Sequence, residues 1–145
     1  MHGFTYTGHP VGAAIAMANL DIIEREKLIE NSARMGTLLI KRLRERLADH
    51  PFVGDVRGVG LMIGIEFVAD KKNRRFFKAE SYPHRLIQQQ AGERRLLVRA
   101  LPFGHVTSMS PPLSITAEEV EEGVNRYTAA AEAAVPALRQ IAEAA

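Results

Sequence analysis

Residues 52–68 decide the fold of this chain, and their sequence is Phe52-Val53-Gly54-Asp55-Val56-Arg57-Gly58-Val59-Gly60-Leu61-Met62-Ile63-Gly64-Ile65-Glu66-Phe67-Val68. Two strand-like runs, 52–56 and 61–68, flank a segment in which Gly58 and Gly60 fit a tight reversal of the chain. The second run is mostly apolar and rich in β-formers, which predicts a strand that is central in a sheet or buried on both faces. The stretch therefore predicts a β-hairpin in the middle of the fold.

Two helices are predicted before the hairpin. Pro10 suits the first turn of a helix, where its missing N–H costs no hydrogen bond, and this helix runs to about Arg25. Its alanines, at positions 13, 14, 16 and 18, predict tight packing in the core. Leucines at helical spacing predict a second helix over about 28–48, which His50-Pro51 ends.

The chain after the hairpin alternates helix and strand patterns. We expect a helix over 82–95 and short strands over 96–100 and 105–109. A capping box, Thr116-Ala117-Glu118-Glu119, opens a last helix that runs to about Ala134, and Pro136 is expected to kink it or to start a new piece. Few strands flanked by helices predict an α+β fold with a short sheet, in a single domain over 1–145.

Composition excludes several classes of protein. A chain of 145 residues with 46% hydrophobic and 25% charged residues is typical of one globular domain. There is no cysteine, and the histidines at 2, 9, 50, 84 and 105 lack ligand spacing, so no metal site is predicted. No apolar run approaches the ~20 residues that span a membrane, and the start lacks a signal-peptide pattern. We expect a cytoplasmic protein with no membrane partner.

Charge is unevenly distributed. Residues 71–99 hold nine basic side chains against two glutamates. Such a stretch is compatible with nucleic-acid binding. No RNA- or DNA-binding motif accompanies the nearby aromatic residues, so a solvated face beside an anionic ligand or partner is favoured. Nucleic-acid binding ranks last among the alternatives, and we expect no nucleic acid as a partner.

The start of the chain has the chemistry of a phosphate site. Its sequence is His2-Gly3-Phe4-Thr5-Tyr6-Thr7-Gly8-His9-Pro10, followed at once by the alanine-rich helix. Backbone N–H groups and threonine hydroxyls close to a helix N-terminus are the donors that a phosphate needs. As a pattern of glycines and threonines alone the signal is weak, because most such loops are only turns.

This segment closely resembles the phosphate-contacting loop of the class III (omega) aminotransferases, which use pyridoxal 5'-phosphate. Residues 54–62 also resemble the hairpin of that family's C-terminal domain, in which Arg57 is a structural arginine paired with a carboxylate such as Asp55 or Glu66. The resemblance covers nearly all of the chain. It implies the small C-terminal domain of a fold type I transferase with an antiparallel sheet, where 1–10 are the phosphate loop and the start of an interdomain helix and 11–145 are the small domain.

The resemblance also implies the site residues. In the family, the backbone N–H at Phe4 and the hydroxyl at Thr5 bind the phosphate held by the other subunit of a dimer, whereas His9 is interpreted as structural. Arg99 matches an arginine that binds a substrate carboxylate and swings away for uncharged amines, and a guanidinium matches a carboxylate bidentately. The turn 101–105 is longer and more apolar than is usual in the family, so Phe103 or His105 are alternative lining residues.

A transaminase needs a lysine that forms a Schiff base with the cofactor. The lysines here, at 27, 41, 71, 72 and 78, lie in amphipathic or charged segments, and in the family the catalytic lysine and the large domain precede this region. We therefore expect part of an aminotransferase for an amine or omega-amino acid and a keto acid, with no catalytic residue of its own and no activity in isolation. The alternative is a non-catalytic oligomerisation or docking module.

Overall fold

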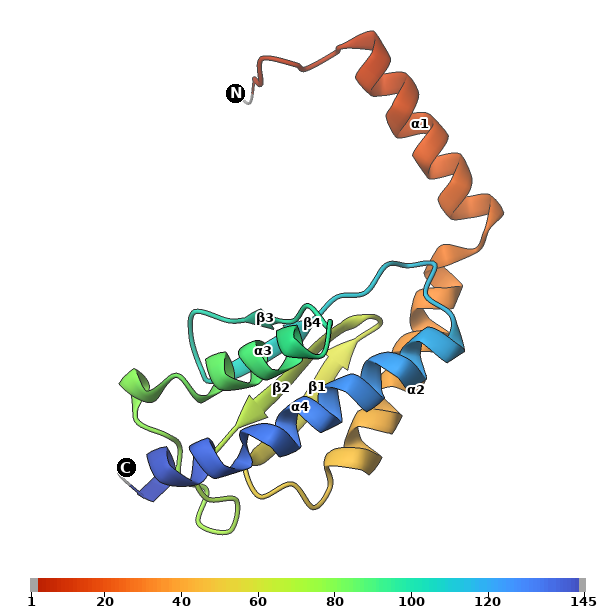
Figure 1. Ribbon diagram of the computed structural model, residues 1–145. Helices are drawn as coiled ribbons and strands as arrows, with labels where there is room; N and C mark the ends of the chain where they lie inside the picture. Colours follow the sequence, from red (N-terminus) through yellow and green to blue (C-terminus); the bar gives the residue numbers. More distant parts are fainter. Residues whose placement is uncertain (1–2, 144–145) are drawn as a thin grey trace.

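The computed structural model describes residues 3–143. Its elements follow the chain as four helices, one 3-10 turn and four strands (Figure 1). They are α1 (Pro10–Arg25), α2 (Leu28–Leu47), β1 (Val53–Val59), β2 (Met62–Phe67), η1 (Ala79–Ser81), α3 (Pro83–Glu93), β3 (Arg99–Ala100), β4 (Val106–Met109) and α4 (Ala117–Glu143). The chain has the α+β fold that the sequence predicts.

The strands form one antiparallel sheet in the order β1-β2-β4-β3. The prediction that the second hairpin strand is central is confirmed, because β2 lies between β1 and β4. The expectation that this strand is buried on both faces is wrong. Ile63, Ile65 and Phe67 are buried on one face of the strand, whereas Gly64 and Glu66 on the other face are only half-buried. The reason is that helices cover one face of the sheet and leave the other without a helical layer.

The hairpin turns later than the sequence indicates. β1 continues to Val59, so Gly58 lies in the strand, and only Gly60 and Leu61 form the turn. Gly60 has a φ of +53°, in the left-handed region that favours glycine. The tight reversal predicted from the two glycines therefore rests on Gly60 alone.

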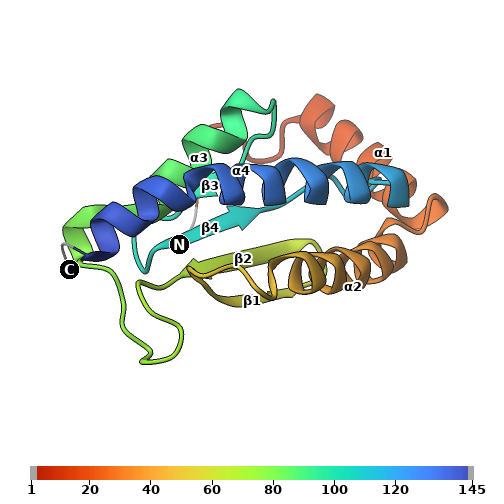
Figure 2. The ribbon, with the colours of Figure 1, turned by 60° about the horizontal axis from the view of Figure 1, so that its bottom comes forward.

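Helices α3 and α4 lie over the same face of the sheet, and α2 runs beside them (Figure 2). The apolar side chains of this face and of the three helices form one core. Its largest enclosed members are Leu43, Ile63, Ile65, Phe67, Ile87, Val120, Val124, Tyr127 and Leu138.

The backbone of α2 touches the hairpin turn. A Cβ atom added at Gly36, in the middle of α2, would lie 2.0 Å from the carbonyl oxygen of Gly60. Only a residue without a side chain fits between these two elements. This contact brings the end of the β1–β2 hairpin against the helical layer.

Two element boundaries differ from the prediction. Helix α4 continues through Pro136 to Glu143, so the expectation of a new piece starting there is wrong. Leu138 and Ala142 are buried beyond the proline, and their burial offsets the lost backbone hydrogen bond. Strand β3 keeps only Arg99 and Ala100, because those are the residues that pair with β4.

Helix α1 does not pack in the core, which corrects the prediction made from its alanines. None of its residues is buried, and it projects away from the body of the molecule (Figure 1). Its exposed apolar side chains are Val11, Ile15, Met17, Leu20 and Ile22. Small residues permit close packing, but nothing in residues 3–143 lies over this helix.

Candidate functional site

The loop before α1 is closed by its own hydrogen bonds. The Phe4 N–H donates to Thr7 Oγ1 at 3.1 Å, and the Thr7 N–H donates to the Phe4 carbonyl at 2.9 Å. Gly8 has a φ of +76°, which turns the chain toward the helix. The Thr5 hydroxyl is exposed and forms no hydrogen bond with any residue of the described range 3–143.

His9 caps α1. Its Nδ1 accepts from the Gly12 N–H at 3.4 Å, and Pro10 occupies the first helical position. This is the structural role expected for His9. Phe4 and Thr5, five and four residues before His9, are exposed close to the positive end of this 16-residue helix. The Thr5 hydroxyl is a free donor there within residues 3–143, whereas the Phe4 N–H is bonded to Thr7.

The sheet register places Arg99 in a row of four residues. Arg57 of β1 pairs with Gly64 of β2, Gly64 with Ser108 of β4, and Ser108 with Arg99 of β3. Residues in register project to the same side of a sheet. An arginine therefore stands at each edge of the helix-free face, with only a glycine and a serine between them.

The two arginines differ in their partners. Arg57 forms ion pairs with Asp55 at 2.9 Å and with Glu66 at 2.7 Å, and these hydrogen bonds raise the pKa of its guanidinium. The prediction that Arg57 is structural is thus confirmed. The guanidinium of Arg99 is exposed and forms neither a hydrogen bond nor an ion pair with the described part of the chain. Arg99 is therefore open to an anion from outside.

The structure does not bring the predicted site residues together. The loop with Phe4 and Thr5 lies at the far end of α1, apart from β3 and Arg99 (Figure 1).

The turn 101–105 carries one exposed and one buried candidate. Phe103, in the middle of this turn, is 83% exposed, whereas His105 is 8% exposed. The His105 ring packs against Phe77 and His84 instead of facing solvent. As an alternative lining residue beside Arg99, only Phe103 stands on the open surface.

Among residues 3–143, three histidines are buried: His50, His84 and His105. Burial lowers the pKa of His50 and of His84, and the neighbouring His105 lowers that of His84 further. The His50 ring contacts the Ala131 carbonyl at 3.2 Å and accepts from the Phe52 N–H. These groups lie inside the fold, so they act on its stability and shape.

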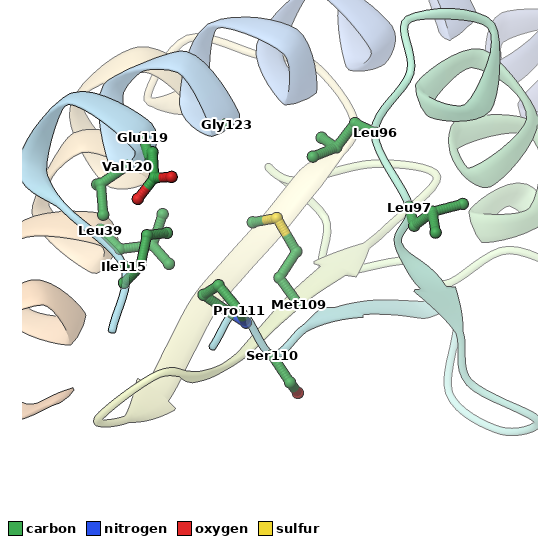
Figure 3. Close-up of a pocket in the computed structure, with 10 residues that line it drawn as sticks. All are labelled: Leu39, Leu96, Leu97, Met109, Ser110, Pro111, Ile115, Glu119, Val120 and Gly123. Carbon is green, nitrogen blue, oxygen red and sulfur yellow. The ribbon is translucent and has the colours of Figure 1, made fainter. Parts of the chain in front are cut away.

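An apolar pocket lies where β4 ends beside the start of α4 (Figure 3). The side chains of Leu96, Met109 and Ile115 line it. The Glu119 carboxylate at its edge accepts hydrogen bonds from the backbone and hydroxyl of Thr116, as the capping box predicts. The pocket offers packing surface but no uncommitted charged group.

The basic stretch is not one free surface. Lys71 donates to the Ala48 and His50 carbonyls, Arg75 to that of Ala142, and Arg94 to Gln90. All five lysines are exposed, so no buried amine is available for a Schiff base. In residues 3–143, no three His, Cys, Asp or Glu side chains gather where they could hold a metal ion. No helix in that range is both long and apolar enough to cross a bilayer.

Comparison with known proteins gives the family. The model of the class-III aminotransferases matches residues 1–131. The chain belongs to this family. It is 44% identical over 137 residues to a diaminobutyrate–2-oxoglutarate transaminase of Halomonas elongata, covering 94% of this chain and 29% of that protein. It is 42% identical over 122 residues to a putrescine–pyruvate aminotransferase of Pseudomonas aeruginosa, covering 83% of this chain and 26% of the relative.

Solved structures agree with this assignment. An omega transaminase of Pseudomonas jessenii in complex with PMP has a TM-score of 0.86 and 37% identity, over 94% of this chain and 30% of that one. A transaminase from a directed-evolution study by ancestral reconstruction has a TM-score of 0.87 and 46% identity, over 93% of this chain and 30% of that one. This aminotransferase chain thus spans less than a third of the length of each of these relatives. The solved structures confirm the predicted fold, that of a small α+β part of a class III aminotransferase.

Sequence reasoning missed two features of the site. Ser108, opposite Arg99, was not singled out, although strand alternation and hairpin register could have placed it on the same face. The contact between His84 and His105 has no local signal, because 20 residues separate them in the chain.

Proposed function

We propose that this chain supplies the substrate-carboxylate residue, Arg99, to a transaminase that uses pyridoxal phosphate. The observation that carries the proposal is the contrast between the two arginines of the sheet face. Two carboxylates hold Arg57, whereas Arg99 has no partner in residues 3–143. Ser108 and Gly64 leave the space beside Arg99 without a large side chain. A planar guanidinium in such a position can bind a carboxylate with two parallel hydrogen bonds.

Phe4 and Thr5 are the proposed contacts for the phosphate of the cofactor. They offer one backbone N–H and one hydroxyl, and the N-terminus of α1 adds a favourable field for an anion. The donor set therefore fits a phosphate. The Phe4 N–H is bonded to Thr7 Oγ1 in the free loop, so a phosphate has to replace that hydroxyl. When bound, the cofactor supplies the electron sink for amino transfer, and these residues hold its phosphate.

The relatives indicate the class of substrates. Their names describe amino transfer from diaminobutyrate or putrescine to 2-oxoglutarate or pyruvate. We propose an amine or omega-amino acid as donor and a keto acid as acceptor for the protein that carries this segment. A dimer, with the loop of one subunit reaching the cofactor of the other, and a cytoplasmic location are part of the same proposal, as is the division into loop (1–10) and small domain (11–145).

A chimera tests the role of Arg99. In the H. elongata relative, the matching 137-residue segment is replaced by this chain, and kcat/KM is measured for a carboxylate-bearing donor and for an uncharged amine. We expect Arg99→Leu to lower kcat/KM about 10- to 100-fold for the first donor only, the value of a charge-assisted hydrogen-bonded pair. Arg57→Leu is the matched control, which affects both donors alike. An equal loss for both donors in Arg99→Leu would refute the assignment.

The chain by itself is expected to be inactive, because none of its lysines is buried. Incubation of the 145-residue chain with pyridoxal phosphate, an amine and pyruvate should give no product above the protein-free background. Turnover that scales with the concentration of the chain would contradict this expectation.

One observation favours a docking module as the second candidate function. The apolar side chains of α1 are exposed along its length, which marks a surface for association. Sedimentation of the isolated chain would show concentration-dependent association that Ile15→Glu abolishes. Ile29→Glu, at an exposed apolar position of α2, is the control. A monomer at all concentrations would remove this candidate.

A further inference from the structure

A hollow lies where β1 and β2 meet the loop 69–78, on the side of the sheet that carries Glu66. Its volume is about 360 Å³, which is within the range of small-molecule sites in proteins. The residues that line it are Gly54, Glu66, Val68, Lys71, Arg74 and Phe76. None of them is among the residues proposed above for substrate or cofactor. The hollow is therefore a separate candidate site.

The loop that forms one wall of the hollow is closed by its own hydrogen bonds. The Asp70 N–H donates to the Arg75 carbonyl and the Arg75 N–H donates to the Asp70 carbonyl, both at 3.0 Å. The Asp70 carboxylate accepts from the backbone N–H and from the side-chain amide of Asn73. The loop projects from the body of the molecule (Figure 2). Arg74 and Phe76, on either side of Arg75, are thus presented by a hydrogen-bonded turn.

The charges around the hollow leave it positive. Lys71 Nζ donates to two backbone carbonyls just after α2, at 2.9 and 3.3 Å, which fixes its position and leaves its third N–H. The Arg74 guanidinium is exposed and forms neither a hydrogen bond nor an ion pair with residues 3–143. The Glu66 carboxylate is neutralised by Arg57 at 2.7 Å. Two positive charges therefore face a ligand in this hollow.

Phe76 gives the hollow an aromatic wall. Its side chain is 59% exposed, whereas that of the next residue, Phe77, is buried in the core. An aromatic face that is open to solvent can stack on a planar ring of a ligand. At the floor, a Cβ atom added to Gly54 would lie 2.7 Å from Val68 Cγ1, so only a residue without a side chain fits there. The lining thus matches a ligand that has both an anionic group and a flat ring.

We propose that this hollow binds a phosphate monoester attached to a planar ring, with the phosphate on Lys71 and Arg74 and the ring against Phe76. A phosphate monoester carries about two negative charges at neutral pH, which match the two cations. The Arg74 guanidinium can donate two parallel hydrogen bonds to it, and Lys71 donates a third. Nucleoside monophosphates and the phosphates of vitamin B6 share this chemistry. The proposal does not rest on the proposed function, because no residue of amino transfer takes part.

Titration of the 145-residue chain, followed by amide NMR, tests the proposal. The probes are adenosine 5'-monophosphate, pyridoxine 5'-phosphate, adenosine and inorganic phosphate; pyridoxine phosphate lacks the aldehyde that would react with exposed lysines. We expect a ring phosphate to shift the amides of Gly54 and of 71–76. It should bind about tenfold or more tighter than inorganic phosphate or adenosine, because only it uses both cations and Phe76. The tighter of the two ring phosphates identifies the source of the ligand.

Three variants of exposed loop residues separate the two parts of the site. Arg74→Gln should weaken the binding of the ring phosphate about tenfold or more, the value of charge-assisted hydrogen bonds. Lys72→Gln is the matched control, because it removes the same charge from an exposed residue of the loop that does not line the hollow. It should change the affinity less than about twofold. Phe76→Leu should weaken the ring phosphate about fivefold or more and leave inorganic phosphate unchanged.

Equal losses in Arg74→Gln and Lys72→Gln would overturn the proposal, because they indicate only a general attraction to a basic loop. Ring phosphates that bind no tighter than inorganic phosphate would also overturn it and leave an adventitious ion only. The third contrary result is a set of shifts confined to residues 4–8, which would support the phosphate loop before α1 instead. Each of these outcomes is independent of how Arg99→Leu discriminates between donors.

Discussion

Replacing Gly36 by alanine should destabilise the domain, against the usual effect of that change in a helix. Gly36 lies in the interior of α2, where Gly→Ala alone gains about 0.5–1 kcal/mol from backbone entropy. The structure opposes this gain, because the new methyl would lie 2.0 Å from the carbonyl oxygen and 2.3 Å from the carbonyl carbon of Gly60. Both atoms are backbone, so no side chain can rotate away.

The size of the effect follows from these distances. An ordinary contact for the methyl needs more than 3.4 Å, so the hairpin turn has to retreat from α2 by over an ångström. Overpacking of this kind costs about 1–3 kcal/mol, and the displaced backbone places Gly36 at the upper end. Subtracting the helix gain leaves a net loss of about 2 kcal/mol. For a domain of this length that is about 6 °C in melting temperature.

Gly123 is the matched control. It also lies inside a helix, α4, but a Cβ atom added there would meet nothing within 4 Å. Gly123→Ala should therefore stabilise the domain by about 0.5–1 kcal/mol, or about 2–3 °C. Urea and thermal unfolding of both variants and the unmodified chain, followed by far-UV circular dichroism, give the two differences.

The comparison between the two variants decides the argument. Helix propensity is common to both, so the gap between them isolates the contact of α2 with the hairpin. If Gly36→Ala is as stable as Gly123→Ala, the two backbones are not in contact and the placement of the hairpin against α2 is wrong. If the Gly36→Ala chain does not fold while the Gly123→Ala chain does, the loss of stability is large and the contact between α2 and the hairpin is supported.

Three further predictions concern stability. Burial lowers the pKa of His50 below its ordinary 6.5, so the unfolded chain binds a proton at a higher pH than the folded chain does. The free energy of unfolding should therefore fall as the pH drops below about 6.5, and urea midpoints at pH 7.5 and 5.5 measure this. His50→Gln should make the free energy of unfolding less dependent on pH. Thr116→Ala removes the cap of α4 and should cost about 1 kcal/mol in urea unfolding, with Thr116→Ser retaining most of it. Thr107→Val leaves the fully buried Tyr127 hydroxyl without its partner and should lower the free energy of unfolding by about 1–3 kcal/mol. In a double-mutant cycle, adding Tyr127→Phe to this variant should recover most of that loss.

Much of the fold could be predicted because its signals are local. The hairpin follows from apolar runs around Gly60, the start of α4 from Thr116 and Glu119, and the pairing of Arg57 from a carboxylate two residues away. Each of these depends on residues that are near in the chain. The resemblance of the opening segment to a known loop added the family, which the comparisons show.

The sequence by itself determined the α+β class, the hairpin, the caps and the family. The tertiary structure alone decided that Arg99 has no partner within residues 3–143, that α1 stays exposed and that α4 passes through Pro136. It also decided the two meetings of distant residues, Gly36 with Gly60 and His84 with His105. The physical reason is that burial and contact belong to pairs far apart in the chain. Secondary-structure propensity and residue spacing depend on a few neighbouring residues, so they do not tell which residues far apart in the sequence will be in contact.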